Sequence, residues 1–421
     1  MTEQAQARQR ARLLLASIVV FLIAAGFRHE GDFESFYIAG AQFLKRLNPY
    51  SPELYQTYRS FGMSSLPPAI VLTCLPCLLP LQAAIPVWDI FCLMLWTASI
   101  YLWAELLWGL PIDWPIFSRL CAVSLIAPLC WAFATHQVIV PVFFFASLAC
   151  WSTRRDYSGW AGLATGCMLM KPHLTLLLAA ALLMKNNRKL LFISGVTAGL
   201  LLPYIPFMNT VRPFSDLRAW ARTIERQQSE VYYLDEQGMA GRMASFFPVV
   251  ARGESKSSNG PGVLIPKSRG RFLARIKTAF WALGCGLWAF WWGLLPSYRR
   301  KPVPRITSTD WTPTFVGVTS TSDDLVLYAG ALAWGLLISP YSHFYDGVIL
   351  TPLIISNLRD ADNFRQMGDL FLAFFSFNFA MILLVVLANR YCFYMWPIMG
   401  WTSVVYCAFA MSIYGLLYNG S

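Results

Sequence analysis

Short polar clusters interrupt the long apolar stretches of this chain, and the first of them carries two carboxylates. Asp32 and Glu34 stand in the segment Gly31-Asp-Phe-Glu-Ser-Phe-Tyr, just after an apolar run. A carboxylate can take the proton of a hydroxyl group and so convert it into a nucleophile. Asp32 is therefore a candidate general base, and the competing interpretation is an ordinary solvated loop charge.

Lys171 and His173 form a second cluster, in the segment Met-Lys-Pro-His between two apolar runs. Pro172 prevents a regular helix at this point. A lysine and a histidine at the tip of a buried hairpin would suit a phosphate group held near lipid headgroups. The alternative is a lysine that extends from a helix end toward the membrane surface.

A third cluster, Ser339-Pro-Tyr-Ser-His-Phe-Tyr-Asp, carries His343 and Asp346. Both are candidate functional residues, although a histidine between two apolar segments is often only a polar stop. Arg390 is a further cation, for which an interfacial anchor is the favoured interpretation. The four histidines of the chain, at positions 29, 136, 173 and 343, all fall at or near turns that we predict on one membrane face.

Membrane-spanning helices must position these clusters. The chain has 421 residues, of which 57% are hydrophobic and only 13% are charged, so it carries more apolar surface than one globular core could bury. Roughly 11 to 13 apolar segments approach the ~20 residues that a helix needs to cross a bilayer. The short alternating segments of a transmembrane barrel do not fit this pattern. We therefore expect an all-α fold, a polytopic bundle of transmembrane helices.

The net charge of +11 would suggest nucleic-acid binding in a soluble protein, but here the basic residues cluster at the ends of apolar segments. That placement indicates membrane topology and contact with lipid headgroups, and no nucleic-acid partner. Arg8, Arg10 and Arg12 precede the first apolar run, and no small-residue cleavage site follows it. We expect a retained first helix with a cytoplasmic N-terminus, in a multi-pass protein of the bacterial inner (plasma) membrane.

The distribution of basic residues and the loop lengths predict an order of regions along the chain. Residues 1–27 form the first transmembrane helix, and residues 28–66 form an outer (periplasmic) catalytic loop with short amphipathic helices. The later regions are the first half of the bundle at 67–208, a long outer loop at 209–271, a transmembrane helix at 272–295, a disordered cytoplasmic linker at 296–324 and the second half of the bundle at 325–421.

The pattern leaves two points open. Residues 67–110 are interrupted by prolines and can hold one span with a re-entrant piece, or two spans. Residues 159–184 can form two short helices joined by a turn, or one long span. We prefer the two short helices, because the basic turns on either side of them then lie in the cytoplasm. This version brings residues 135–137, 171–173 and 339–346 to the same outer face.

The sequence offers no support for a nucleotide, metal or cofactor site. It contains none of the glycine-rich phosphate loops, dinucleotide fingerprints or paired Cys/His spacings that would signal one. Cys74 and Cys77 form a Cys-x-x-Cys pair, for which packing in an apolar segment is a better interpretation than redox chemistry. Few charged residues lie inside the predicted spans, and Asp89 and Glu105 are marginal cases. This scarcity of charge favours a site at the membrane interface.

Several short motifs, taken in order, resemble glycosyltransferase family 87, which has the GT-C fold. They are Asp32-Phe33-x-x-Phe36-Tyr37-x-Ala39, Asn48-Pro49-Tyr50, Pro67-Pro68, His136-Gln137, Gly162 and Gly166 leading to Lys171-Pro172, and Ser339-Pro340. The chain also departs from the family's motifs. His136 stands where the family has glycine, Ile139 where it has asparagine, and Leu66 where it has tyrosine.

The resemblance implies transfer of a sugar, typically mannose, from a polyprenyl-phosphate donor to a glycan or glycolipid acceptor at the outer face. It also implies an inverting reaction in which Asp32 is the catalytic base. Lys171, with help from Arg390, would hold the lipid phosphate, and His343 or Asp346 would position the donor or acceptor. The other candidates for substrate binding are Glu34, Tyr37, Asn48, Tyr50, His136, Gln137 and His173.

Two other functional classes remain as alternatives. A transporter or flippase of lipids or small molecules would require ionisable residues deep inside the spans, and the sequence shows few. A non-catalytic membrane subunit of a polysaccharide assembly complex is the other alternative, and the residues alone do not separate it from an enzyme.

Overall fold

The computed structural model describes residues 31–47, 49–50, 66–108, 124–207, 231–233, 254–255, 262–264, 267–294, 319–339 and 344–356, together with residues 117, 120–121, 215, 218–219 and 221–222. Our predictions for residues 1–27, Asn48, His343 and Arg390 lie outside the described residues. The Asp32 backbone is described, but its side chain is not.

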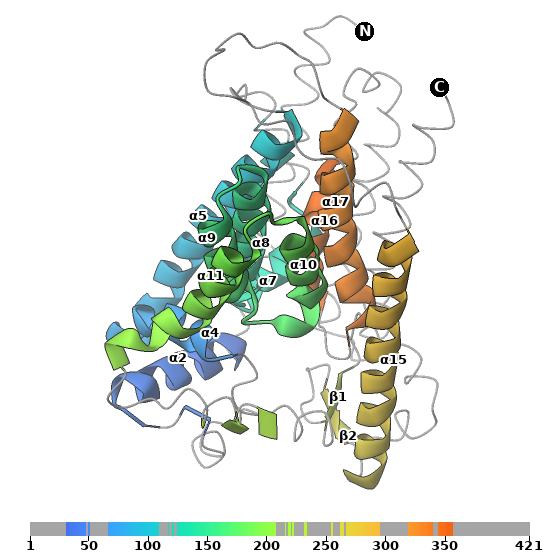
Figure 1. Ribbon diagram of the computed structural model, residues 1–421. Coiled ribbons are helices and arrows are strands. Elements are labelled where there is room, and N and C mark those ends of the chain that lie inside the picture. The colour runs from blue at the N-terminus through green and yellow to red at the C-terminus, as the bar shows by residue number, and fades with distance from the viewer. Residues whose placement is uncertain are drawn as a thin grey trace, which may run out of the picture.

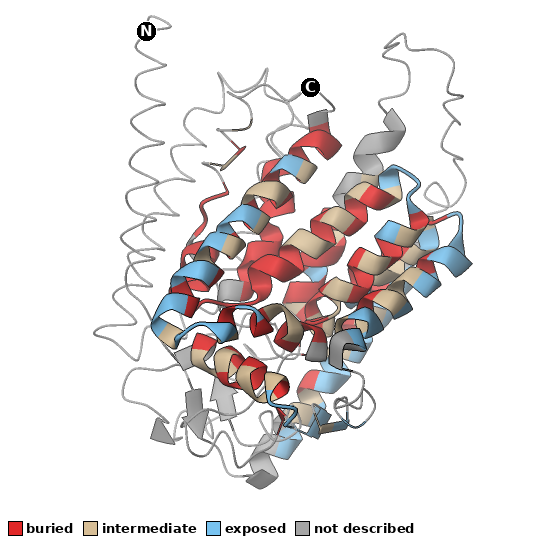
Figure 2. Cartoon of the chain, turned by 90° about the vertical axis from the view of Figure 1, so that its left-hand side faces the viewer, coloured by how far each residue is buried: buried red, intermediate tan, exposed pale blue. Residues whose placement is uncertain are grey.

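A bundle of apolar helices forms the body of the described structure (Figure 1). Its members are α5 (Leu81–Trp108), α7 (Ala127–Ala134), α8 (Ile139–Arg154), α9 (Ser158–Met168), α10 (Pro172–Lys185), α11 (Lys189–Leu201), α15 (Lys267–Leu294), α16 (Thr319–Ile338) and α17 (Thr351–Ser356). The 3-10 helix η2 (Leu202–Phe207) extends α11, and the 3-10 helix η4 (Phe344–Leu350) precedes α17. Figure 2 shows buried residues where the helices meet and exposed residues on their outer faces.

The turn between α9 and α10 reverses the chain. The hydroxyl of Ser158, at the start of α9, donates a hydrogen bond to the side-chain oxygen of Asn186, which follows α10. The end of α10 therefore lies beside the start of α9. Residues 159–184 form two antiparallel helices, as our preferred version predicts, and the alternative of one long span is wrong.

Facing glycines allow α9 and α11 to approach closely, side by side and parallel. A Cβ atom added to Gly162 would lie 2.1 Å from the carbonyl oxygen of Phe192, and one added to Gly199 would lie 2.3 Å from that of Leu163. Small residues on both helices are the usual means of such close packing in membrane bundles. The Gly162 and Gly166 pair thus fixes α9, and α9 leads directly into the turn that carries Lys171.

A short helical layer crosses the lower end of the bundle in Figure 1. It consists of α2 (Gly31–Leu44), α4 (Pro67–Cys74) and the 3-10 helix η1 (Pro76–Leu78). Phe33, Phe36 and Phe43 are buried on the inner side of α2, as expected for an amphipathic helix that covers an apolar surface. The helix predicted within residues 28–66 is therefore present, and Asp32 lies in its first turn rather than in a loop.

Residues 67–110 contain one long helix, α5, preceded by the short α4. Among the described residues, α5 contains the one segment, Leu81–Leu107, that is both long and apolar enough to cross a membrane, while α8, α10 and α11 are shorter apolar helices. This arrangement matches the version with one span and an additional short piece. The total of about 11 to 13 crossings remains a prediction from the sequence.

The described residues also include elements that the sequence did not predict. Strands β1 (Val231–Tyr233), β2 (Glu254–Ser255) and β3 (Gly262–Leu264) form a small antiparallel sheet in the order β1-β3-β2, with Val231 opposite Leu264 and Glu254 opposite the same residue on the other side. Apart from this small sheet, the described elements are helical, as the expectation of an all-α fold requires. Strands of two or three residues are too short to show an alternating pattern in a sequence.

Two predicted boundaries also move. Helix α15 begins at Lys267, inside the predicted outer loop, and α16 begins at Thr319, inside the predicted linker. Residues 319–324 read Thr-Ser-Thr-Ser-Asp-Asp, which in a sequence looks like a polar linker. The same residue types are favoured in the first turn of a helix, because they cap free backbone N–H groups and complement the helix dipole.

Candidate active site

The helix junctions alternate between two ends of the bundle. Helices α5 and α8 are parallel, since the indole of Trp88 bonds the carbonyl of His136 and that of Trp103 bonds Ser147. Helices α10 and α16 are antiparallel, since Lys185 pairs with Asp324 near the start of α16. We use the name His136 end for the end that contains the α7–α8 turn, the α9–α10 turn and η4. We use the name Arg155 end for the opposite end, which contains the α8–α9 and α10–α11 turns.

The His136 end brings together the three polar segments that the sequence analysis places on one face. Lys171 in the α9–α10 turn donates a hydrogen bond from Nζ to Oδ1 of Asp346 in η4, at 2.7 Å. Helix α7, which ends beside His136 and Gln137, packs against η4. The predicted convergence is therefore confirmed for residues 135–137, residues 171–173 and Asp346. The membrane side on which they meet stays a prediction.

The side chains of Lys171 and Asp346 form a buried ion pair, with 9% and 1% of their surfaces exposed. Pro172 occupies the first position of α10, where a missing N–H group costs nothing. The hydroxyl of Thr175 donates to the carbonyl oxygens of Met168 and Lys171, both at 3.1 Å, and so ties the turn to the first turn of α10. Lys171 therefore points into the protein.

The loop that precedes α4 is joined to the same turn. The backbone N–H of Leu66 donates to the carbonyl oxygen of Met170 at 3.3 Å, directly before Lys171. His173 lies in the first turn of α10 and is partly buried. Leu66, the last residue of the predicted catalytic loop, is thus a neighbour in space of the predicted phosphate-binding turn.

His136 is buried against a carboxylate from α5. Its Nδ1 lies 2.7 Å from Oδ1 of Asp89, and 1% of the histidine side chain is exposed, compared with 29% for Asp89. The ring of Phe33 meets the His136 ring edge to face, with centroids 5.8 Å apart, and also packs on Trp88. Phe33 follows Asp32 in α2, so the first turn of α2 lies beside His136.

The structure places other predicted substrate-binding residues at this end, and they differ in burial and in hydrogen bonding. Tyr37 donates a hydrogen bond from its hydroxyl to the carbonyl oxygen of Leu79 at 2.7 Å, and so fastens α2 to the segment after η1. Tyr50 and Gln137 are buried, and Glu34 is partly buried. Burial, assisted by the nearby Cys77, raises the pKa of the Tyr37 hydroxyl, which favours its neutral form.

Asp89 also lies at this end, but it was not among the site residues predicted from the sequence. A carboxylate inside an apolar helix needs a partner or a polar cavity, and this requirement could have identified Asp89 as a candidate. The partner itself, His136, is 47 positions away in the chain. Nothing in the sequence pairs these two residues, because the contact exists only where α5 and the α7–α8 turn meet.

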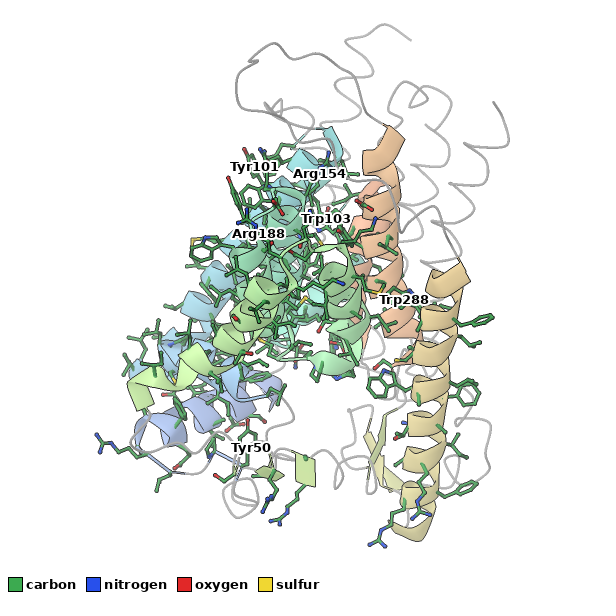
Figure 3. All side chains as sticks on the ribbon, in the orientation of Figure 1. Tyr50, Tyr101, Trp103, Arg154, Arg188 and Trp288 are labelled. Atoms are coloured by element: carbon green, nitrogen blue, oxygen red, sulfur yellow. The ribbon has the colours of Figure 1, made fainter. Side chains whose placement is uncertain are left out.

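The Arg155 end has a different set of contacts. Arg155 bonds Glu105 and lies over the ring of Trp151, with 5.6 Å from Cζ to the ring centroid. Arg154 donates to the carbonyl oxygen of Leu106. Figure 3 shows Arg154 and Arg188 at the upper end of the bundle and Tyr50 at the opposite, lower end. These cations belong to the basic turns on either side of residues 159–184, which we predict to lie in the cytoplasm.

Cys74 and Cys77 pack between α4 and α2. Cys77 lies 3.2 Å from the carbonyl oxygen of Tyr37 and 2.9 Å from that of Thr73, within reach of S–H hydrogen bonds. Burial raises the pKa of both thiols from 9.0 to about 12, whereas a redox-active thiol needs a lowered pKa. This agrees with a packing role for the pair.

The match to a known family decides the class of the protein. The model of glycosyltransferase family 87 matches residues 67–321, which is more than half of the chain. The chain belongs to glycosyltransferase family 87. Membership in this family identifies a membrane glycosyltransferase that moves a sugar between a donor and an acceptor. No curated protein and no solved structure matches the chain.

The family 87 match covers part of the His136 end. It extends from the start of α4 to the start of α16 and so includes Asp89, His136 and Lys171. Asp32 and Asp346 lie outside the matched residues. The family assignment made from the order of short motifs is confirmed, and it disfavours the transporter and the non-catalytic subunit.

Proposed function

We propose that this family 87 enzyme transfers mannose from a polyprenyl-phosphate donor to a glycan or glycolipid acceptor at the outer face of the inner membrane. The observation that carries the proposal is that a buried lysine, Lys171, lies at the same end of an apolar bundle as the first turn of α2 and Leu66, the residue before α4. A lipid-linked sugar phosphate needs a cation for its phosphate beside an apolar region for its chain.

Lys171 binds the donor phosphate in this proposal. An ammonium group carries three N–H donors, so Lys171 can bond Asp346 and a phosphate oxygen together. Asp346 stabilises the charged form of the lysine in a buried position and fixes the direction of its side chain. Arg390 assists from outside the described residues. As the bond from the sugar to the phosphate breaks, the fixed positive charge stabilises the electron pair that remains on the phosphate oxygen.

Asp32 is the general base of the reaction. Its carboxylate takes the proton of the acceptor hydroxyl while that oxygen forms a bond to the anomeric carbon of the sugar. The lipid phosphate leaves from the opposite side of the same carbon, so the configuration inverts. Asp32 precedes Phe33, which packs on His136, and this neighbourhood supports its place in the site. His343 or Asp346 positions the donor or the acceptor.

The wider organisation follows from the same proposal. The chain is a multi-pass bundle of about 11 to 13 transmembrane helices of the GT-C type, with a cytoplasmic N-terminus. The His136 end faces the periplasm and the Arg155 end faces the cytoplasm, because arginines and lysines gather at the second. Its partners are the lipid-linked donor, the acceptor and membrane lipids.

A transfer assay tests this function directly. Purified protein in lipid is mixed with radiolabelled polyprenyl-phosphate-mannose and a cell-wall or membrane extract, and wild type is compared with Asp32→Asn. We expect label in a new product with wild type and none with the variant, which should insert and fold normally. A fully active Asp32→Asn enzyme would exclude Asp32 as the base. Transfer from a nucleotide sugar instead of the lipid donor would overturn the proposed donor class.

A further inference from the structure

The backbone at His136 has an unusual conformation. Its φ angle is 53°, in the left-handed region that favours glycine. The family motif resembled by this segment has glycine before the glutamine, and this chain has histidine. A histidine is strained in that conformation, where a glycine would not be. The presence of the histidine side chain at this position therefore needs an explanation. That side chain is buried and held by Asp89.

Asp89 fixes which nitrogen of the His136 ring carries the proton. An ionised carboxylate only accepts hydrogen bonds, so the 2.7 Å contact puts a proton on Nδ1. In the neutral ring, Nε2 then carries a lone pair and accepts a hydrogen bond. Among the described residues, no group bonds to this buried Nε2 atom. Buried polar atoms in proteins nearly always have a partner, so the atom indicates a ligand or a bound water that completes it.

The surroundings of His136 favour a neutral sugar. Phe33 and Trp88, both fully buried, place aromatic rings at this point, and apolar and aromatic side chains with a few fixed polar groups line most small-molecule sites. The phosphate of a lipid-linked sugar has only acceptor oxygens at neutral pH, so it has no proton to give to Nε2. The negative charge of Asp89 also opposes a phosphate at this position.

We propose that Nε2 of His136 accepts a hydrogen bond from a sugar hydroxyl, and that Asp89 is the positioning residue that holds the ring in the required tautomer. This inference rests on the proposed function, because it assigns two parts of one substrate site. Lys171 binds the phosphate, and His136 binds the sugar beside it. The sugar belongs either to the donor or to the acceptor, and the KM measured for each substrate distinguishes these two cases.

The first test observes His136 directly. The protein has four histidines, so ¹⁵N-histidine labelling in lipid nanodiscs gives a simple spectrum, and the spectrum of His136→Gly assigns the signal. We expect the deprotonated nitrogen to be Nε2 and its resonance to shift with octyl mannoside but not with farnesyl phosphate. A response to farnesyl phosphate alone would overturn the inference. A response to neither probe would assign a structural water and overturn it as well.

The second test measures kinetics with a matched control. Since glycine suits a φ of 53°, His136→Gly should fold normally and raise KM for one sugar substrate about tenfold, with a smaller effect on kcat. Added imidazole should restore part of the loss. Asp89→Asn should show an intermediate effect, because an amide can also donate to Nδ1. Asp156→Gly is the control, since Asp156 has a φ of 57° and is exposed at the Arg155 end.

The two tests separate this inference from the proposed function. If wild type transfers the sugar and His136→Gly keeps both KM values, the function stands and the inference fails. If wild type transfers no lipid-linked sugar, the proposed function fails, and the nitrogen resonance still shows whether Nε2 binds a hydroxyl. An unchanged KM for the donor with a raised KM for the acceptor assigns the hydroxyl to the acceptor, and the reverse result assigns it to the donor.

Discussion

The two ends of the bundle use charged residues in different ways. At the His136 end, Lys171 and Asp346 are 9% and 1% exposed. At the Arg155 end, the ion pair of Lys185 with Asp324 has exposed fractions of 22% and 32%, and Arg155 is 48% exposed. A buried ion pair seldom stabilises a fold more than apolar side chains of the same size would. The difference fits the proposed role of the buried pair in the reaction, and it fits a role of the more exposed cations in topology and anchoring.

Removing one cation from each end tests whether the two ends differ in this way. Lys171→Met leaves the Asp346 carboxylate buried without its cation, and we expect a loss of about 3–5 kcal/mol in the free energy of unfolding. Lys185→Met leaves Asp324 partly exposed to solvent, and we expect a loss of about 0.2–1 kcal/mol. Thermal unfolding in detergent measures both. Equal losses at the two ends would contradict the distinction between them.

Removing both partners of the buried pair separates stability from function. The double variant Lys171→Met with Asp346→Leu should recover most of the stability lost in Lys171→Met, since no charge remains buried. Its sugar transfer should stay about 10²-fold below wild type, because the phosphate has lost its cation. Lys185→Met should transfer within about twofold of wild type, as expected for a change at an exposed pair away from the site. An active double variant would assign the pair a structural role only.

Close helix packing gives the next effect in size. Gly162→Ala puts a methyl group against the carbonyl oxygen of Phe192, so α9 and α11 must separate, and we expect a loss of about 1–3 kcal/mol. Transfer should fall with it, because α9 leads into the Lys171 turn. Gly286→Ala, which meets no atom within 4 Å, is the matched control. We expect it to be neutral or stabilising by about 0.5–1 kcal/mol.

The smallest effect concerns the thiols of α4 and η1. A pKa raised from 9.0 to about 12 keeps Cys77 protonated across the physiological range, so its contribution to stability is complete below pH 9 and is lost as the pH rises toward 12. Alkylation of Cys77 by iodoacetamide, followed by mass spectrometry, should be slow at pH 8 and rise with pH beyond 9. Cys77→Ser should leave transfer unchanged. Rapid labelling at neutral pH would instead indicate a reactive thiol.

Much of the fold was predictable from local pattern. The apolar runs gave α5, α8, α9, α10 and α11, because a helix in an apolar environment needs only its own hydrogen bonds and apolar side chains. Helix α2 was predicted as one of the short amphipathic helices within residues 28–66. The small sheet and the early start of α16 were not, because strands of two or three residues and polar helix ends have no distinctive pattern.

The candidate site was predictable in part. Alternating helices require the turns at 135–137 and 171–173 to share one end, so their convergence followed from the sequence. Neither ion pair of this end followed from it. Lys171 and Asp346 are separated by 175 positions, and Asp89 and His136 by 47. Each pair joins two elements whose relative rotation decides which side chains meet.

The sequence by itself determined a helical membrane protein of glycosyltransferase family 87 and the positions of its polar turns, because hydrophobicity and chain reversal are local properties. Only the tertiary structure decided that Lys171 is buried against Asp346 and that Asp89 holds His136. The reason is physical: a buried charge or ring nitrogen is defined by its partner, and helix packing brings that partner from a distant part of the chain.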